Sequence, residues 1–427
     1  MIQNLYETYL QSHRVTTDSR AITPGCIFVA LKGERFDGND FIPQALEQGA
    51  AMCVGGDDAL PTLQELAREH RRHLQIPVIG ITGTNGKTTT KELVHAVLAK
   101  RYKTSATKGN FNNHLGVPLT LLSIPEGTEI AIVEMGANHP GEIEFLCGIA
   151  DPDCGLITNV GRAHLEGFGS FEGVIKTKTE LYRHLAAKGG KVFVNADNEI
   201  LMQKSEGMPR FTYGRDERAD VRGTLVAGGT SNPSPYLHFY FEVGDNVYNV
   251  HTHLLGAYNF DNCMAAVAVG LHFGVEPWDI KEAIEEYVPS NQRSEYRETS
   301  RGNRLYLDCY NANPSSMAAA IESFKGMGGT MAIIGGMHEL GADERQEHEK
   351  VVEQLAGCGL DCVLLVGPEW DTQMLPTASC QLSTTHYQLF PDTESVRAWL
   401  EANPVADATI LVKGSNTNRL WTLEGLL

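Results

Sequence analysis

Short apolar runs of strand length alternate with amphipathic helical patterns along most of the chain. The runs VIGITG, EIAIVEMGA and CGLITNVG are largely apolar throughout, which is typical of strands buried on both faces of a sheet. Helical patterns such as TTKELVHAVLAKRY, with apolar residues three and four positions apart, follow many of these runs. This order predicts an α/β protein in which parallel sheets are covered by helices.

The pattern divides into three blocks, which we expect to be three domains. Residues 1–76 hold two strand-like and two helix-like stretches and predict a small α/β domain. Residues 77–290 predict a central domain around a mostly parallel sheet, with an antiparallel hairpin in SPYLHFYFEVGDNVYNVHTHLL. Residues 291–427 alternate strands and helices from RLYLDCY to ATILVKGS, which is typical of a Rossmann-like, doubly wound domain. A chain of 427 residues is too long for one hydrophobic core, in agreement with this division.

Composition limits the partners that we expect. A formal net charge of −18 opposes general binding to nucleic acid or anionic lipid. The longest apolar runs fall short of the roughly 18 residues that span a bilayer, and the first residues lack the pattern of a secretory leader. The nine cysteines contain no C-x-x-C pair, so buried free thiols are favoured over a zinc site. We therefore expect a cytoplasmic monomer without membrane insertion or nucleic-acid binding.

The segment IGITGTNGKTTT resembles a phosphate-binding loop, although its glycines depart from the strict Walker spacing. An apolar strand ends at a glycine-rich turn, and a helical pattern begins beside a lysine and a hydroxyl. Backbone N–H groups and the lysine would bind phosphates, and the hydroxyl would ligate Mg²⁺. The alternative is a glycine-rich turn with an exposed lysine. The predicted nucleotide-binding residues are Gly83, Thr84, Asn85, Gly86, Lys87, Thr88 and Thr89.

Polar residues at the ends of later strands are further candidates for this site. Glu134 ends an apolar strand, where a carboxylate would face the loop and coordinate a metal; a helix cap or surface charge is the alternative. His164 follows another strand, within ITNVGRAHLEGFGS. Lys178 lies in a helical pattern and, taken alone, would be a solvated lysine. Several strand ends converging on one crevice are typical of an α/β active site.

Together these motifs resemble the Mur ligase family. The resemblance rests on GTNGKT, VEMGAN, ITNVGRAHLEGFGS and YNFDN, and it covers the chain from about Thr16 to Ser415. The further motifs TTDSR, ALKGERFDG, TKGNFNNHLG, DCYNANPSSM and VKGS resemble the branch that joins D-alanyl-D-alanine to UDP-N-acetylmuramoyl-tripeptide. The resemblance implies a UDP-binding first domain, a P-loop ATPase-like central domain and a C-terminal ligase domain. It also implies ATP and Mg²⁺ as cofactors.

The resemblance implies roles for individual residues. Lys87 would bind the ATP phosphates; the metal ligands would be Thr88, Glu134, His164 and a carbamylated Lys178. Contacts to the nucleoside and phosphates would come from Asn259, Asn262, Arg293 and Asp308. The UDP pocket would hold Asp18, Ser19, Arg20, Lys32 and Gly33. The muramoyl path and the dipeptide site would hold Asn110, Asn112, Asn113, Asn311 and Asn313, for which turn formation is the alternative.

Three positions depart from the family pattern. Gly336 stands where an aspartate is usual, Asn416 where an arginine is common, and Gln292 where a glycine precedes the arginine. Two other functions remain open from the sequence. One is a sister ligase that adds a different amino acid; the other is a nucleotide-dependent switch protein, which would hydrolyse ATP independently of any amine.

Overall fold

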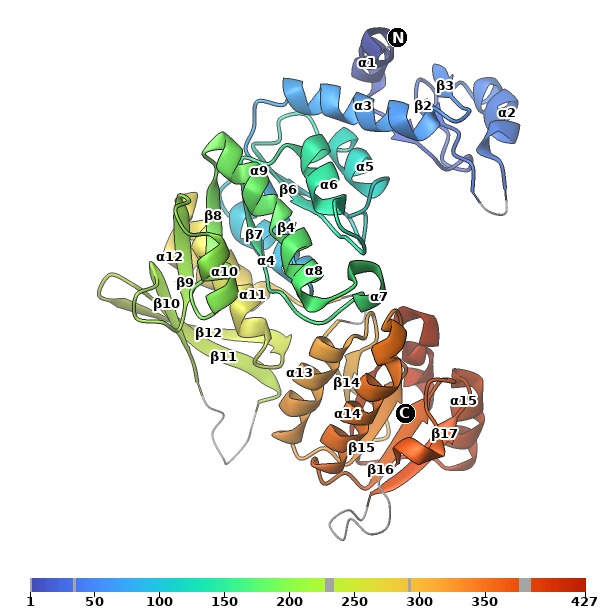
Figure 1. The fold of residues 1–427 in the computed structure, drawn as a ribbon, viewed down its shortest axis with the longest axis vertical. Helices are drawn as coiled ribbons and strands as arrows, with labels where there is room; N and C mark the ends of the chain where they lie inside the picture. Colours follow the sequence, from blue (N-terminus) through green and yellow to red (C-terminus); the bar gives the residue numbers. More distant parts are fainter. Residues whose placement is uncertain (1, 34–35, 227–233, 291–292, 376–384) are drawn as a thin grey trace.

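The computed structural model describes residues 2–33, 36–226, 234–290, 293–375 and 385–427. Three β-sheets follow one another along the chain and along the long axis of the molecule (Figure 1). The sheets have three, nine and six strands, and helices cover them. The α/β class expected from the sequence is confirmed.

The first sheet is parallel, with strand order β1-β2-β3. Helix α3 buries Leu63, Leu66 and Ala67 and packs against helices of the central part. The Nε of Arg71 donates to the carbonyl oxygen of Ala150 at 2.9 Å, and its Nη2 pairs with Asp153 at 2.8 Å. The elements are α1 (Ile2–Ser12), β1 (Val15–Thr16), β2 (Ile27–Val29), α2 (Ile42–Glu47), β3 (Met52–Val54) and α3 (Ala59–His73).

The central sheet has the order β12-β11-β10-β9-β8-β7-β4-β6-β5. Its strands pair in parallel up to β10, and β11 and β12 form the antiparallel hairpin expected from the sequence. The strands are β4 (Val78–Thr82), β5 (Thr104–Ala106), β6 (Ile130–Glu134), β7 (Cys154–Ile157), β8 (Lys191–Asn195), β9 (Arg210–Gly214), β10 (Val221–Leu225), β11 (Tyr236–Val243) and β12 (Asn246–Leu255).

Alternate residues of the central strands face two different cores. Val78 packs in one core with residues of α6 and α9, whereas Ile79 packs in the other with residues of α4 and α11. This explains why β4 is apolar up to its last residue, Thr82, and buried along its whole length. The helices are α4 (Lys87–Ala99), α5 (Gly116–Leu122), α6 (Glu142–Ala150), α7 (Leu165–Phe168), α8 (Phe171–Lys178), α9 (Glu180–Lys188), α10 (Glu199–Lys204), α11 (Asn259–His272) and α12 (Pro277–Glu286).

The third sheet has the order β13-β14-β18-β15-β16-β17, in which β13 alone pairs antiparallel. The last strand, β18, inserts between β14 and β15, as in a doubly wound fold. Its elements are β13 (Glu295–Glu298), β14 (Arg304–Asp308), α13 (Pro314–Lys325), β15 (Met331–Gly335), α14 (Glu344–Ala356), β16 (Cys362–Val366), β17 (His386–Phe390), α15 (Thr393–Ala402) and β18 (Thr409–Lys413). Strands β13 and β17 were not anticipated.

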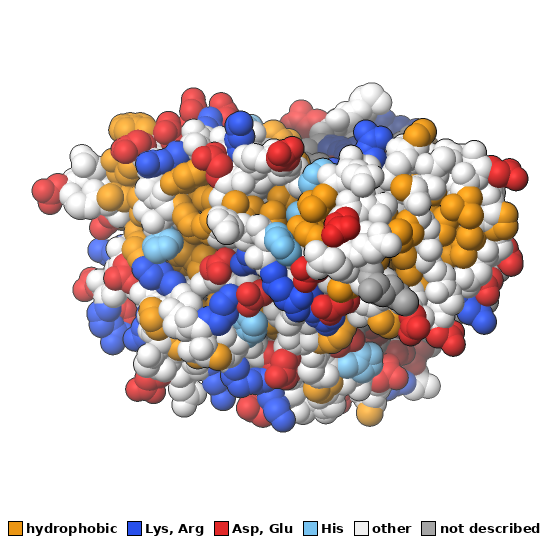
Figure 2. All heavy atoms as spheres, turned by 90° about the horizontal axis from the view of Figure 1, so that it is seen from above, with side chains coloured by type: hydrophobic (Ala, Val, Ile, Leu, Met, Phe, Trp, Pro, Cys, Tyr) orange, Lys and Arg blue, Asp and Glu red, His pale blue; other side chains and the backbone are white. Residues whose placement is uncertain are grey.

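Each sheet lies within one of the three predicted ranges, 1–76, 77–290 and 291–427. The boundaries themselves stay predictions, and the second falls at residues outside the described part. Acidic and basic side chains are interspersed over the face shown in Figure 2. Within the described residues, no helix combines the length and the apolar character needed to cross a bilayer.

Candidate active site

A cavity of about 680 Å³ lies where the carboxyl ends of strands from the central and third sheets meet. It follows β4, β6 and β7 on one side and β14 and β18 on the other, the place at which α/β proteins bind ligands. The predicted residues that line it are Thr84, Asn85, Gly86, Lys87, Thr88, Thr89, Asn110, Asn112, Asn113, Glu134, His164, Asn259, Asn262, Arg293, Asp308 and Asn311.

The glycine-rich loop forms one wall of the cavity. Gly83 has φ +145° and Gly86 has φ +76°, backbone conformations that residues other than glycine rarely adopt. A Cβ at Gly83 would lie 1.9 Å from Oγ1 of Thr158, so the loop also lacks space for one. The backbone N–H groups of Thr84 and Asn85 donate to Asn159 at 3.0 Å each. The loop is therefore held in one conformation as α4 begins.

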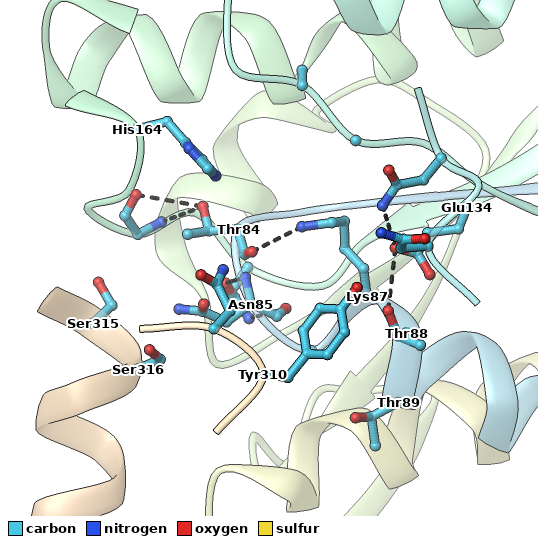
Figure 3. Close-up of a pocket in the computed structure, with 18 of the residues that line it drawn as sticks. Thr84, Asn85, Lys87, Thr88, Thr89, Glu134, His164, Tyr310, Ser315 and Ser316 are labelled. Atoms are coloured by element: carbon cyan, nitrogen blue, oxygen red, sulfur yellow. Dashed lines mark hydrogen bonds between the residues drawn. The ribbon is translucent and has the colours of Figure 1, made fainter. Parts of the chain in front are cut away.

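Lys87 is the first residue of α4, and its ammonium is turned back over the loop (Figure 3). Its Nζ donates to the carbonyl oxygens of Gly83 and Thr84 at 2.9 Å each. Burial lowers the pKa of Lys87, and the nearby Glu134 carboxylate opposes that shift. The lysine side chain thus lies beside the free N–H groups at the start of a helix, an arrangement suited to a phosphate group.

Glu134 ends β6 and is almost fully buried against the cavity. Its Oε1 accepts from Nδ2 of Asn112 at 2.7 Å and from Oγ1 of Thr88 at 3.3 Å (Figure 3). Its Oε2 is buried and has no hydrogen-bond partner among the described residues. An unpaired carboxylate oxygen in such a place is costly unless a cation or donor reaches it.

This donor set fits Mg²⁺. The described residues contain no group of three or more His, Cys, Asp or Glu side chains that could enclose a metal ion. Mg²⁺ usually takes only one or two protein carboxylates and completes its coordination with water and substrate phosphates. The orphaned oxygen of Glu134 beside the hydroxyl of Thr88 provides such a partial site.

His164 precedes α7 with a left-handed backbone, φ +50°, and its ring points toward the phosphate loop in Figure 3. Its Nδ1 contacts Oε2 of Glu339, which belongs to the third sheet's loops. Burial lowers the pKa of His164, and the Glu339 carboxylate opposes that shift. The structure thus places the predicted histidine at the cavity, with a partner that the sequence had not indicated.

Lys178 ends α8 behind the cavity wall rather than in it. The residue is 2% exposed, so it is not the solvated lysine that its sequence context alone favoured. Its Nζ donates to the carbonyl oxygen of Ala137, a cavity residue, at 3.2 Å. Burial and repulsion from Lys87 lower the pKa of Lys178 well below its usual value. Burial therefore disfavours the charged form of this side chain.

The predicted asparagines have structural roles as well as positions at or beside the cavity. The amide of Asn262, in α11, accepts a hydrogen bond from Thr90 of α4 at 3.0 Å and so links the two helices. Within α11 it donates to Asn259 at 2.8 Å. Oδ1 of Asn113 accepts from the N–H groups that start α5, and Asn313 caps α13. The alternative of turn or cap formation therefore holds for Asn113 and Asn313.

The predicted uridine-binding residues do not line this cavity. They lie around the first sheet. Asp18 and Arg20 form an exposed ion pair at 2.8 Å, and the backbones of Lys32 and Asp37 form an isolated antiparallel β-bridge. The members of this group are Asp18, Ser19, Arg20, Lys32 and Gly33. A ligand that reaches both places would have to be elongated.

Models of three protein-family domains match the chain: "Mur ligase family, catalytic domain" at residues 11–96, "Mur ligase middle domain" at 81–270 and "Mur ligase, glutamate ligase domain" at 292–416. A curated relative from Bacillus subtilis (strain 168), named UDP-N-acetylmuramoyl-tripeptide--D-alanyl-D-alanine ligase, is 38% identical over 373 residues, covering 83% of this chain and 80% of the relative. The chain belongs to the Mur ligase family.

Solved structures share the fold of this Mur ligase over nearly its whole length. A MurF structure from Acinetobacter baumannii has a TM-score of 0.83 at 30% identity and covers 96% of this chain and 92% of its own. A MurF ligase from Thermotoga maritima in complex with ADP has a TM-score of 0.82 at 29% identity, with 97% and 96% covered. The ADP complex agrees with a nucleotide site in this fold.

Lys413 and Tyr310 are among the cavity residues of this Mur ligase that the sequence analysis did not predict. Lys413 ends β18 fully buried and donates to Oδ2 of Asp308 at 2.6 Å. The guanidinium carbon of Arg293 lies over the Tyr310 ring, 3.6 Å from the centre of that ring. In ATILVKGS an apolar strand ends in Lys413. A polar residue at the end of an apolar strand is the same signal that identified Glu134. Tyr310 carried no such signal.

The departure at Gly336 is matched elsewhere in this Mur ligase. A Cβ at Gly336 would lie 2.3 Å from Oε2 of Glu369, so the Glu369 carboxylate occupies the space of a side chain at 336. The Oε1 of Glu369 pairs with Nδ1 of His338 at 3.2 Å. An acidic group therefore occupies the space that a side chain at position 336 would take.

Proposed function

We propose that the protein is an ATP-dependent ligase that joins D-alanyl-D-alanine to UDP-N-acetylmuramoyl-tripeptide in cytoplasmic synthesis of peptidoglycan precursors. The observation that carries the proposal is a phosphate loop, fixed by its own hydrogen bonds, that faces the buried Glu134 carboxylate with its one unpaired oxygen. The chain is also 38% identical to a relative named UDP-N-acetylmuramoyl-tripeptide--D-alanyl-D-alanine ligase. We expect it to act as a monomer.

The reaction needs an activated carboxyl group, because a carboxylate does not condense with an amine at neutral pH. The tripeptide carboxylate attacks the γ-phosphorus of ATP, which forms an acyl phosphate and releases ADP. The amine of D-alanyl-D-alanine then adds to the acyl carbon and loses a proton, and inorganic phosphate leaves. Each step conserves atoms and requires no redox partner.

The chain's own groups position the phosphates and neutralise their charge. The N–H groups at the start of α4 and the Lys87 ammonium would receive the phosphoryl oxygens. Mg²⁺, when bound, would offset further negative charge on those oxygens. Glu134 and Thr88 would hold it, with His164 and Lys178 as further ligands.

Lys178 would become a ligand only after modification. A neutral amine can form an N–C bond to carbon dioxide and release one proton, which converts the amine into a carbamate anion. Lys178 is buried, and burial disfavours its charged form, so its amine is suited to that step. Its Nζ lies against Ala137, so an extended carbamate would reach toward the cavity.

Further residues would hold the substrates. Asn259, Asn262, Arg293 and Asp308 would bind the nucleoside and phosphates, and the first domain would bind UDP through Asp18, Ser19, Arg20, Lys32 and Gly33. The peptide and dipeptide would lie near Asn110, Asn112, Asn113, Asn311 and Asn313. This division suits an elongated substrate that carries UDP at one end and a reactive carboxylate at the other.

Phosphate release tests the proposal. With ATP, Mg²⁺ and UDP-N-acetylmuramoyl-tripeptide, we expect fast release only when D-alanyl-D-alanine is added. Release at one slow rate with or without amines would instead support the switch protein, and a preference for a single amino acid would support a sister ligase. Lys87→Ala should lower the rate about 100-fold or more, since it removes a preorganised charge. The exposed Lys176→Ala is the matched control.

A further inference from the structure

Two loops from different sheets meet at one edge of the cavity. The Glu339 carboxylate, in the loop after β15, contacts Nδ1 of His164, in the loop after β7. The N–H of Glu166 donates to the carbonyl oxygen of Glu339 at 3.4 Å. A Cβ at Gly341 would lie 3.6 Å from Cβ of Glu166, so the loops pack closely. The contact depends on how the third domain sits against the central one.

Both partners of this contact have a strained backbone. His164 has φ +50° and Glu339 has φ +61°, in the left-handed region that residues other than glycine seldom occupy. Such a conformation is energetically costly and persists where the surroundings hold it, often at functional sites. Two such residues therefore face each other across the interface between the central and third domains.

A simple ion pair does not account for this geometry. The Glu339 side chain is 52% exposed, and exposed ion pairs contribute little to stability. The interface already has a pair between Arg162 and Glu347 at 3.4 Å, which joins the same two domains without a left-handed residue. The contact at His164 therefore calls for a role in the site itself.

The imidazole ring offers such a role, because its two nitrogens differ. When Nδ1–H donates to a carboxylate, the neutral ring has its lone pair on Nε2. His164 lines the cavity, and its ring points toward the phosphate loop (Figure 3). Histidines that bind a metal commonly donate their other N–H to a carboxylate, which sets the tautomer and orientation of the ring.

We propose that Glu339 is a positioning residue: the third domain supplies its carboxylate to Nδ1–H of His164 and so directs the Nε2 lone pair into the cavity. This inference rests on the proposed function, in which His164 is a ligand of Mg²⁺. It makes completion of the metal site depend on docking of the third domain. An acyl phosphate would then form only in the closed arrangement, in which water has less access.

Two variants of Glu339 separate positioning from charge. Glu339→Ala removes the acceptor, whereas Glu339→Gln keeps an oxygen acceptor for Nδ1–H without the charge. The control is Glu347→Gln, which weakens the neighbouring interdomain pair but does not contact His164. For Glu339→Ala we expect kcat and Mn²⁺ affinity to fall about 10–100-fold, as for other outer-shell partners of a metal ligand. Glu339→Gln and Glu347→Gln should stay within a few fold of the parent protein.

The tautomer can be measured without turnover. Protein labelled with ¹⁵N-histidine is examined by long-range ¹H–¹⁵N NMR with saturating ADP and EDTA, and the His164 signals are assigned by their loss in His164→Gln. We expect the Nδ1–H form in the parent protein and in Glu339→Gln, and a shift toward Nε2–H in Glu339→Ala. An unchanged tautomer in Glu339→Ala, or equal losses of activity in both Glu339 variants, would overturn the proposal. A protein with the expected tautomers but no amine-dependent phosphate release would contradict the ligase function instead.

Discussion

Asn85 and Asn313 pair their side-chain amides across the interface between the central and third domains. Nδ2 of Asn313 donates to Oδ1 of Asn85 at 2.7 Å, and the reverse pair measures 3.4 Å. Asn85 belongs to the phosphate loop and Asn313 caps α13. The third domain is therefore tied directly to the loop that would hold ATP.

Breaking this amide pair should slow the ligation step. Asn85→Ala and Asn313→Ser each remove the pair, and serine retains a side-chain oxygen for the cap of α13. With about 0.5–1.5 kcal/mol for each of the two hydrogen bonds, kcat/KM for the dipeptide should fall by about 5-fold to 150-fold in either variant. The double variant should be no worse than the singles, as in a double-mutant cycle for one shared interaction. Independent, multiplying losses would contradict this pairing.

Removing the buried amine of Lys178 should separate stability from activity. Lys178→Met replaces a nearly inaccessible amine with an apolar side chain of similar length, so thermal unfolding should shift to higher temperature while phosphate release is lost. In Lys178→Ala, added short carboxylates such as acetate should restore part of the rate if a carbamate is the active form. The exposed Lys176→Met, on the same helix, should change neither property. Full activity of Lys178→Met would exclude the carbamate.

A side chain at position 336 should be tolerated only when the Glu369 side chain is shortened. Gly336→Asp places a Cβ into the space of the Glu369 carboxylate and adds a second negative charge, which should cost about 1–3 kcal/mol of the free energy of unfolding. Glu369→Ala in the same chain removes the overlap and should recover most of that loss. Urea unfolding of the parent, both single variants and the double variant measures the coupling. Additive effects would show that the two positions do not share this space.

His70 should make the stability of the first domain depend on pH. Burial lowers the pKa of His70 to about 4, from 6.5 for an accessible histidine, and its ring lies against Tyr9. The stabilising effect is complete above pH 6.5 and is lost as the pH falls toward 4, because the unfolded chain binds the proton first. The loss between pH 7 and pH 5 should be about 2 kcal/mol.

Chemical unfolding of the parent protein and His70→Gln at these two pH values tests this prediction. The variant should lose most of the pH-dependent difference. His73→Gln changes a half-exposed residue on the same helix and should keep the difference. Equal pH dependence in all three proteins would assign it to other groups.

The central strands and the phosphate loop could be predicted because their signals are local. VIGIT is apolar up to its last residue since both of its faces are buried, and Gly83 and Gly86 mark the turn that only glycine can make. Strands β13, EYRE, and β17, HYQLF, were not predicted because they lie at the edges of their sheet and lack the continuous apolar run of the central strands.

The partners of the site residues could not be predicted in the same way. The contact of Glu339 with His164 joins residues 175 positions apart and exists only because two domains are placed against each other. The burial of Lys178 likewise depends on the packing of α8 behind the cavity wall. The resemblance to a family indicated His164 and Lys178 but not Glu339, and local sequence chemistry did not distinguish Lys178 from a surface lysine.

The ammonium of Lys87 already has two hydrogen bonds to its own loop. Asn159 accepts hydrogen bonds from the backbone N–H groups of Thr84 and Asn85. The phosphate loop therefore has little conformational freedom left to lose when a triphosphate binds. Nucleotide capture should then be rapid and carry only a small entropic penalty in the loop. The slow, ordering event of the cycle would be the approach of the third domain.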